Sequence, residues 1–98
     1  MREATWYIYM VECSDRSLYT GVAKDVKARV CQHNDGLGAK YTMARRPVEL
    51  VYVEEIEGRG AALRREHAIK RLQAAAKRRL IANGPHGVAD EQRASAPA

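Results

Sequence analysis

The chain has 98 residues, 30% of them charged, and its formal net charge at pH 7 is +5. We expect one small domain with a thin core and no second module. The positive charge favours a polyanion such as nucleic acid as partner over an acidic protein. Cys13 and Cys31 are too few for a zinc site or a disulfide framework. The start of the chain has no signal-type segment, and no apolar run approaches the roughly 20 residues that span a bilayer. These features predict a cytoplasmic protein without a membrane partner.

Two runs rich in aromatic and aliphatic residues predict a β-hairpin. They cover residues 6–13 and 18–22, and a polar turn over 14–17 separates them. The register decides which side chains share a face, because a slip of one residue turns every side chain over. A two-residue loop would break the apolar pattern, so we prefer a three-residue loop or an equivalent bulge.

The three-residue loop places two tyrosines on one face of the hairpin. It sets Tyr9 opposite Gly21 and Val11 opposite Tyr19. The other face then carries a mostly apolar set suited to packing against helices, namely Trp6, Ile8, Met10, Leu18, Thr20 and Val22.

A helix is predicted after the hairpin. Asp25 is a suitable N-cap for a helix that runs to about His33, and residues 34–38 end it. Arg29 and His33 are four residues apart, so they project from one face of this helix. Residues 36–42 then predict a loop or a short helical turn.

The remaining pattern predicts one more strand and a helical region. Residues 48–54 predict a third strand, and the Ala-rich stretch 59–83 predicts two helical segments broken near 73–75. We therefore expect an α/β (α+β) domain over 1–83, with a three-stranded, mainly antiparallel sheet flanked by helices. A disordered tail is expected over 84–98.

Glu66 is the only acid between Glu57 and Asp90, within a strongly basic stretch. On a helix it lies one turn from Ile69 and falls on the apolar stripe. A carboxylate there requires a cation, a metal or hydrogen-bond donors to offset its burial. Spacing alone leaves a metal ligand and an ion pair open, the pair being with Arg65, Lys70 or Arg29.

Taken singly, the other polar residues have ordinary structural explanations. Tyr9 and Tyr19 suit cross-strand packing, and Arg29 with His33 suits a solvated helix face. The basic run 77–79 suits a solubilising helix end or a contact with phosphates.

Several short blocks occur in an order that resembles the GIY-YIG nuclease superfamily. The resemblance runs from about residue 6 to 80 and looks closest to small stand-alone bacterial members related to the nuclease domain of the excision-repair incision enzyme (UvrC-like, YhbQ-type). The blocks are Tyr9, Tyr19-Thr20-Gly21, Asp25-Val26-Lys27-Ala28-Arg29, Gln32-His33-Asn34, Gly38-Ala39-Lys40-Tyr41-Thr42 and Ala62-Leu63-Arg64-Arg65-Glu66.

This resemblance implies a metal-dependent endonuclease that hydrolyses DNA phosphodiester bonds, structure-selective and acting in DNA repair or recombination. Glu66 is then expected to bind Mg²⁺ or Mn²⁺, and Arg29 to stabilise charge on the phosphate. His33 is expected to contact the phosphate or to help move a proton. Tyr19 is expected to orient or deprotonate the attacking water, with Tyr9 supporting it.

The resemblance also implies a set of nucleic-acid contacts and leaves alternatives open. Tyr7 and Thr20 depart from the family motifs at packing positions, and Val22 stands where the excision-enzyme branch has a lysine. A non-catalytic nucleic-acid-binding module of the same fold and an adaptor for an acidic protein therefore remain alternatives. RNA remains an alternative substrate, and a partner protein is a possible source of targeting. The expected nucleic-acid-binding residues are Lys24, Lys40, Thr42, Arg45, Arg46 and Lys70.

Overall fold

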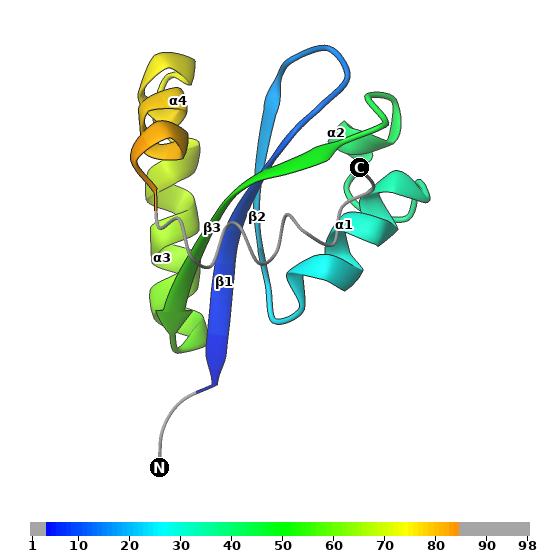
Figure 1. The fold of residues 1–98 in the computed structure, drawn as a ribbon. Coiled ribbons are helices and arrows are strands. Elements are labelled where there is room, and N and C mark those ends of the chain that lie inside the picture. The colour runs from blue at the N-terminus through cyan, green and yellow to red at the C-terminus, as the bar shows by residue number, and fades with distance from the viewer. Residues whose placement is uncertain (1–3, 85–98) are drawn as a thin grey trace.

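The computed structural model describes residues 4–84, which form a three-stranded antiparallel sheet with helices on both faces (Figure 1). None of the helices in this range is long and apolar enough to cross a membrane. The strand order is β2-β1-β3, so the expected fold class is confirmed. The expected tail lies outside the described residues apart from Gly84. The elements are β1 (Thr5–Glu12), β2 (Leu18–Ala23), α1 (Val26–Asn34), α2 (Lys40–Met43), β3 (Glu49–Glu57), α3 (Arg59–Lys70) and α4 (Ala74–Asn83).

The hairpin between β1 and β2 has the expected three-residue loop. The Cys13 amide donates to the Ser17 carbonyl at 2.8 Å, and Arg16 takes a positive φ of 72° in the loop. A left-handed residue at the end of a three-residue loop matches the twist of the two strands. Tyr9 therefore pairs with Gly21 as predicted, and Tyr9 and Tyr19 share a face of the hairpin.

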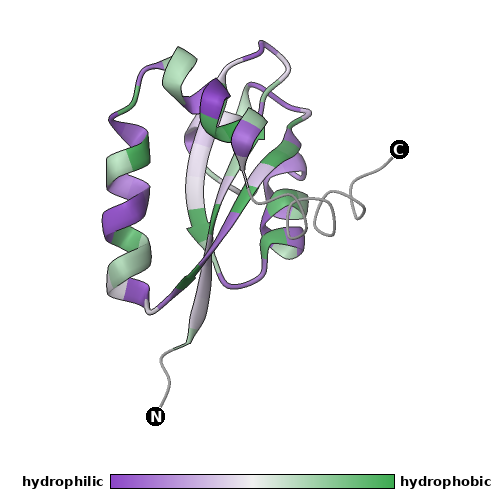
Figure 2. Ribbon diagram, turned by 60° about the vertical axis from the view of Figure 1, so that its left-hand side comes forward, coloured by the Kyte–Doolittle hydropathy of each residue, from purple (hydrophilic) through white to green (hydrophobic). Residues whose placement is uncertain are grey.

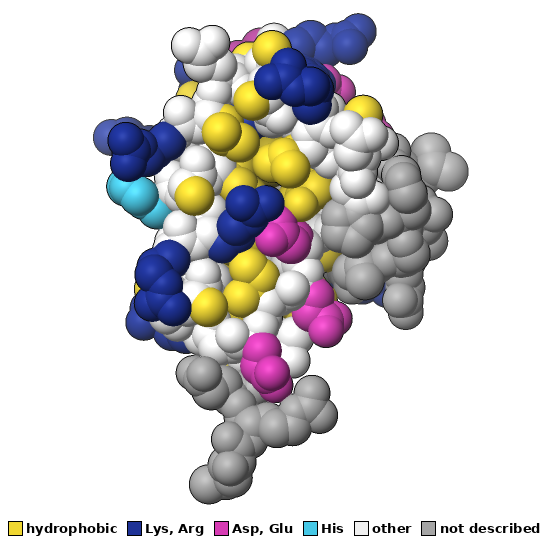
Figure 3. All heavy atoms as spheres, turned by 90° about the vertical axis from the view of Figure 1, so that its left-hand side faces the viewer, with side chains coloured by type: hydrophobic (Ala, Val, Ile, Leu, Met, Phe, Trp, Pro, Cys, Tyr) yellow, Lys and Arg dark blue, Asp and Glu magenta, His cyan; other side chains and the backbone are white. Residues whose placement is uncertain are grey.

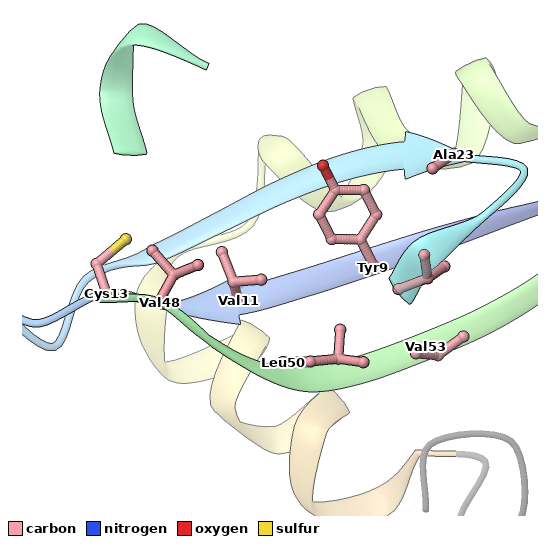
Figure 4. Close-up of a cluster of buried hydrophobic side chains, with 8 residues drawn as sticks. Tyr9, Val11, Cys13, Ala23, Val48, Leu50 and Val53 are labelled. Carbon is pink, nitrogen blue, oxygen red and sulfur yellow. The ribbon is translucent and has the colours of Figure 1, made fainter. Parts of the chain in front are cut away.

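The sheet separates two apolar clusters. The cluster on the α1 side contains Tyr9, Val11, Cys13, Ala23, Val26, Val48, Leu50 and Val53, most of which Figure 4 labels. The cluster beneath α3 and α4 contains Ile8, Met10, Tyr52, Ala62 and Ile69, with Trp6 and Val22 packed against it. Figure 2 shows hydrophilic and hydrophobic residues alternating along α3, as expected for a helix with one face on the sheet. The predicted packing of the Ile8 and Met10 face against helices is confirmed.

Two element boundaries differ by more than one residue from the sequence expectation. β3 runs to Glu57, three residues beyond the predicted end, because it pairs with β1 along nearly the whole of that strand. Glu55 and Glu57 point to solvent while Ile56 packs against the apolar cluster beneath α3. The break between α3 and α4 covers 71–73, slightly earlier than predicted.

Polar side chains join the helices to the sheet. At the end of α1, the Asn34 amide accepts from Val48 N at 2.7 Å and donates to Val48 O at 3.1 Å, so it binds the chain just before β3 much as a neighbouring strand would. On the α3–α4 side, hydrophobic side chains surround a few charged ones (Figure 3). Arg65–Glu54 at 2.9 Å and Arg78–Glu12 at 2.6 Å are ion pairs that reach strands from α3 and α4.

Thr20 offers a test of core packing. Its Oγ1 is the one buried side-chain polar atom in residues 4–84 without a hydrogen-bond partner. Because Thr20→Val keeps the shape and removes an unsatisfied hydroxyl, we expect the free energy of unfolding to rise by about 1 kcal/mol in urea titrations. The buried Thr42 hydroxyl, which bonds the Ala39 carbonyl, is the matched opposite, and Thr42→Val should lower stability. A lower free energy of unfolding in Thr20→Val would contradict the conclusion that the unpaired Thr20 hydroxyl destabilises the core.

Candidate active site

A chain of buried polar side chains runs from the sheet to α2. The Tyr9 hydroxyl lies 2.7 Å from His33 Nε2, and His33 Nδ1 lies 2.7 Å from Thr42 Oγ1. The Thr42 hydroxyl donates to the Ala39 carbonyl at 2.9 Å, so its oxygen is left to accept from Nδ1. The Ala39 amide also approaches Nδ1, but at 3.4 Å it is the weaker contact. We therefore assign a neutral His33 that carries its proton on Nδ1 and accepts the Tyr9 proton at Nε2.

Three ionisable groups surround the Tyr9 phenol. Burial raises the pKa of Tyr9 to about 12, and a hydrogen bond from Arg29 opposes this effect. The nearby Tyr19 and Glu66 raise the same pKa through their charge. Figure 4 shows the Tyr9 ring standing out from β1 with its hydroxyl beside β2. His33 contacts this hydroxyl directly, and Arg29, Tyr19 and Glu66 lie near enough to act on its pKa. The fold therefore brings all five expected catalytic residues to one region, from β1, β2, α1 and α3.

Tyr19 lies in a partly exposed aromatic group. Its ring meets His33 edge-on with 5.2 Å between centroids, and it stacks against Tyr41 at 6.0 Å and 25°. The Lys70 ammonium lies 5.8 Å from the Tyr19 centroid. On Tyr41, the Arg45 guanidinium lies 3.9 Å from the ring centroid. Tyr19 is thus the motif phenol that solvent can reach, whereas Tyr9 is fully buried.

Glu66 projects from α3 and is paired with a lysine one turn along the helix. Glu66 Oε2 lies 3.4 Å from Lys70 Nζ, and the Glu66 side chain is 18% exposed. Of the ion-pair partners considered from the sequence, Lys70 is the one that the structure places in contact. One partly exposed carboxylate fits a hard cation that completes its coordination with water and phosphate oxygens. Residues 4–84 hold no group of three or more His, Cys, Asp or Glu suited to a metal.

Arg29 lies one turn before His33 on α1 and is half-buried. Its Nη1 donates to Gln32 Oε1 at 2.8 Å. Burial, and secondly the charge of Arg29, lower the pKa of His33 below its ordinary value of 6.5. His33 is therefore neutral at pH 7, which agrees with the directions of its two hydrogen bonds.

Two expected contacts with nucleic acid require correction. The side chains of His33 and Thr42 are fully buried, and each is committed to hydrogen bonds inside the protein. Neither side chain can touch a phosphate in this structure. His33 positions the Tyr9 hydroxyl by a hydrogen bond, and Thr42 positions the His33 ring in the same way.

The other expected nucleic-acid-binding residues differ in how free they are. Lys24 and Lys40 are exposed, although the Lys24 ammonium lies 5.1 Å over an indole ring. Arg45 pairs with Asp15 at 3.1 Å and donates to the Tyr41 carbonyl. Arg46 and Lys70 also have partners inside the protein, the Met43 carbonyl and the Glu66 carboxylate. Lys40 therefore offers the least encumbered positive charge on the α2 side.

Three residues of the site were not singled out from the sequence. A Cβ at Gly21 would lie 2.5 Å from the Tyr9 hydroxyl, and one at Gly38 would overlap the His33 ring. Tyr41 covers Tyr19. All three stand inside the motif blocks, which is the signal that could have found them, but their contacts join segments far apart in the chain. Val22, in contrast, packs on the α3 side of the sheet, away from the Tyr9 face.

Comparisons with known proteins agree with this fold. The GIY-YIG catalytic domain family matches residues 5–79. The chain therefore belongs to the GIY-YIG nuclease superfamily, as its motifs predicted.

Within that superfamily the chain is similar to the UPF0213 proteins. It is 53% identical to one from Staphylococcus saprophyticus over 78 residues, covering 80% of this chain and 95% of the relative. It is 59% identical to one from Staphylococcus aureus over 75 residues, covering 76% and 92%. The solution NMR structure of a UPF0213 protein from Bacillus halodurans superposes with a TM-score of 0.56 at 34% identity, covering 89% of this chain and 93% of that one.

The buried His33 predicts a pH dependence of stability. Because the pKa of His33 is lower in the folded state than in the unfolded state, the unfolded chain binds more protons as the pH falls below about 6.5. The free energy of unfolding should therefore fall between pH 7.5 and pH 5.5, as measured by urea denaturation. The drop should shrink in His33→Gln and persist in His67→Gln, where the replaced histidine is exposed. An unchanged drop in His33→Gln would contradict the assignment.

Gly21 predicts a steric test with a matched control. In Gly21→Ala the new methyl group meets the Tyr9 phenol, which His33 holds in place, so we expect a loss of about 1–3 kcal/mol of stability. Gly60→Ala adds the same methyl in α3, where the nearest atom, on Arg64, is 3.5 Å away. That control should gain up to about 1 kcal/mol from helix propensity. Equal effects of the two substitutions in thermal denaturation would show that Tyr9 can move aside freely.

Proposed function

We propose that this protein is a metal-dependent endonuclease that hydrolyses phosphodiester bonds of DNA. The observation that carries the proposal is the contact of Tyr9 and Tyr19 with His33, at 2.7 Å from the Tyr9 hydroxyl to Nε2 and 5.2 Å between the Tyr19 and His33 rings. Arg29 and Glu66 lie near enough to act on the pKa of Tyr9. Packing alone gives no reason to bring a guanidinium from α1 and a carboxylate from α3 to one buried phenol. Membership of a nuclease superfamily supports the same conclusion.

Phosphate binding is assigned to Arg29. Its guanidinium is half-buried beside Tyr9, and its planar fork can donate two hydrogen bonds to phosphate oxygens. In a partly desolvated site these donors are stronger than in water, and they stabilise the charge that grows on the phosphate during attack. The net charge of +5 favours approach of the DNA backbone.

Glu66 would hold the cation, Mg²⁺ or Mn²⁺. Its carboxylate supplies one hard oxygen ligand, and water with phosphate oxygens would supply the others. When bound, the cation offsets negative charge at the scissile phosphate. Lys70 occupies the neighbourhood of the carboxylate in this structure and would have to share it with the metal.

The two tyrosines receive different roles. Tyr19 is partly exposed and lies near the Lys70 ammonium, so it is the phenol assigned to orient or deprotonate the attacking water. Tyr9 is buried, donates to His33 and has a pKa of about 12, so it is assigned to hold the geometry of the site. Any proton that His33 helps to move must pass through the Tyr9 hydroxyl.

One observation favours the alternative of a nucleic-acid-binding module without catalysis. The ion pair with Lys70 gives Glu66 a structural partner that needs no metal. Both functions predict DNA binding, and they differ in whether the phosphate backbone is cut. The proposal extends to selectivity for particular DNA structures and to a role in DNA repair or recombination, which follow from the family and not from the site.

The two functions are separated by removing the carboxylate. The substrate panel contains linear, nicked, flapped and branched DNAs and an RNA control. With Mg²⁺ or Mn²⁺ present, we expect the wild type to cut at least one member of this panel. Glu66→Ala should lose at least about 100-fold in cleavage rate while retaining much of its DNA affinity. Glu55→Ala, which removes an exposed acid from β3, should cut normally. A Glu66→Ala protein that cuts like the wild type would falsify the assignment.

Backbone binding predicts a steep response to salt. With about three phosphate contacts, DNA affinity should fall roughly 10- to 100-fold between 50 and 200 mM salt. Lys40→Ala should reduce the slope of log affinity against log salt by about one. Lys77→Ala, on α4 at the opposite side of the sheet, should leave it unchanged (Figure 1). Binding that hardly responds to salt would instead favour the adaptor for an acidic protein.

A further inference from the structure

Exposed hydrophobic side chains gather beside the site. Five large hydrophobic side chains are exposed in the described part of the chain, and three of them belong to residues 36–46, which we term the α2 lobe. They are Leu37, Met43 and Tyr41, exposed by 72%, 47% and 39%. Neither Leu37 nor Met43 contributes to either apolar cluster of the domain.

The exposure of Leu37 is unusual for its position. Gly36, with φ of 79°, closes α1: its amide donates to the His33 carbonyl, and the Leu37 amide donates to the Gln32 carbonyl. At helix ends of this type, a hydrophobic residue in the Leu37 position usually packs back against the last turn of the helix. Here the side chain stands in solvent, so folding of the described domain does not account for it.

The segments that carry Leu37 and Met43 are connected by one arginine. Arg46 donates to the Met43 carbonyl at 2.8 Å and to the Asn34 carbonyl at 3.4 Å, so one side chain bridges the end of α2 and the end of α1. A Cβ on Gly36 would lie 3.0 Å from the same guanidinium. Arg46 therefore holds the end of α2 against the end of α1. The lobe carries the exposed apolar side chains of Leu37 and Met43 together with this guanidinium.

The α2 lobe is continuous with the site and its charge fits nucleic acid. Tyr41 stacks on Tyr19, and Thr42 holds His33, so the lobe borders the proposed place of cleavage. No acid occurs between Asp35 and Glu49. The lobe carries three cations, Lys40, Arg45 and Arg46, among its exposed apolar groups.

We propose that the α2 lobe binds unstacked bases next to the scissile phosphate, so that the preferred ligand is DNA with interrupted stacking. Leucine and methionine side chains insert between base steps and replace stacking contacts, while nearby cations bind the backbone. At a nick or flap one strand is interrupted, so unstacking costs less there than in a continuous duplex, and insertion of Leu37 and Met43 favours the interrupted DNA. The position of the cut rests on the proposed function, but the binding preference does not.

Binding can be measured without cleavage in Glu66→Gln. Three DNAs of one sequence, a continuous duplex, a nicked duplex and a flap, carry the fluorescent base 2-aminopurine at the interrupted step. We expect the nicked and flapped DNAs to bind about tenfold more tightly than the duplex, with a fluorescence change that reports altered stacking. Adding Leu37→Ser and Met43→Ser should bring the preference to about one, and Leu37→Ser alone should reduce it in part.

Leu72→Ser is the matched control. It replaces another exposed leucine, between α3 and α4 on the other side of the sheet (Figure 1). This variant should keep the tenfold preference. Equal binding of the three DNAs by Glu66→Gln, or an undiminished preference in the double substitution, overturns the proposal. If the preference is present and wild-type protein with Mg²⁺ or Mn²⁺ cuts nothing, the inference stands and the endonuclease proposal fails.

Discussion

The hydrogen bond between the Tyr9 hydroxyl and His33 Nε2 is the contact on which the site depends. It is fully buried and joins the central strand to α1, and the opposite nitrogen of His33 extends the link to Thr42 in α2. A buried polar group left unpaired costs about 1–3 kcal/mol, so the three side chains hold one another in a single arrangement. Gly21 and Gly38 are small because the two rings occupy the space that a Cβ would need.

The hydrogen-bonded side chains of Tyr9, His33 and Thr42 are neutral, and charged side chains lie between them and solvent. Arg29 and Tyr19 are partly exposed, and Glu66 with Lys70 approaches from α3 on the other side of the sheet. The interior therefore sets geometry with groups that do not change charge near pH 7, and the rim carries the groups that can meet a phosphate or a cation. Such a division lets the site remain rigid while its charged groups stay available to a ligand.

The described domain uses its remaining surface unevenly. On the α3–α4 side, the Arg65–Glu54 and Arg78–Glu12 pairs fasten helices to strands. On the α2 side, the apolar side chains of Leu37 and Met43 are left in solvent. Leu63 and Leu72 on the α3–α4 side are exposed by only 36% and 38%, so the most exposed large hydrophobic side chains lie on the side next to Tyr19.

The hairpin register and the capped helix could be predicted from local patterns in the sequence. Alternation of side chains along residues 6–13 and 18–22 admits one partition that buries an apolar face, and Asp25 has few other roles before a helix. These are local rules, and they sufficed to place Tyr9 and Tyr19 on one face. The nuclease superfamily was recognised in a different way, from the resemblance of the ordered motif blocks to those of its known members.

Only the tertiary structure decided which of these residues are buried and what each one contacts. Burial of His33 and Thr42, the choice of Lys70 as partner of Glu66, and the exposure of Leu37 all depend on segments distant in the chain meeting in space. The extension of β3 to Glu57 likewise came from pairing with β1. Periodicity and spacing describe one segment at a time, whereas burial and hydrogen bonding are properties of several segments packed together.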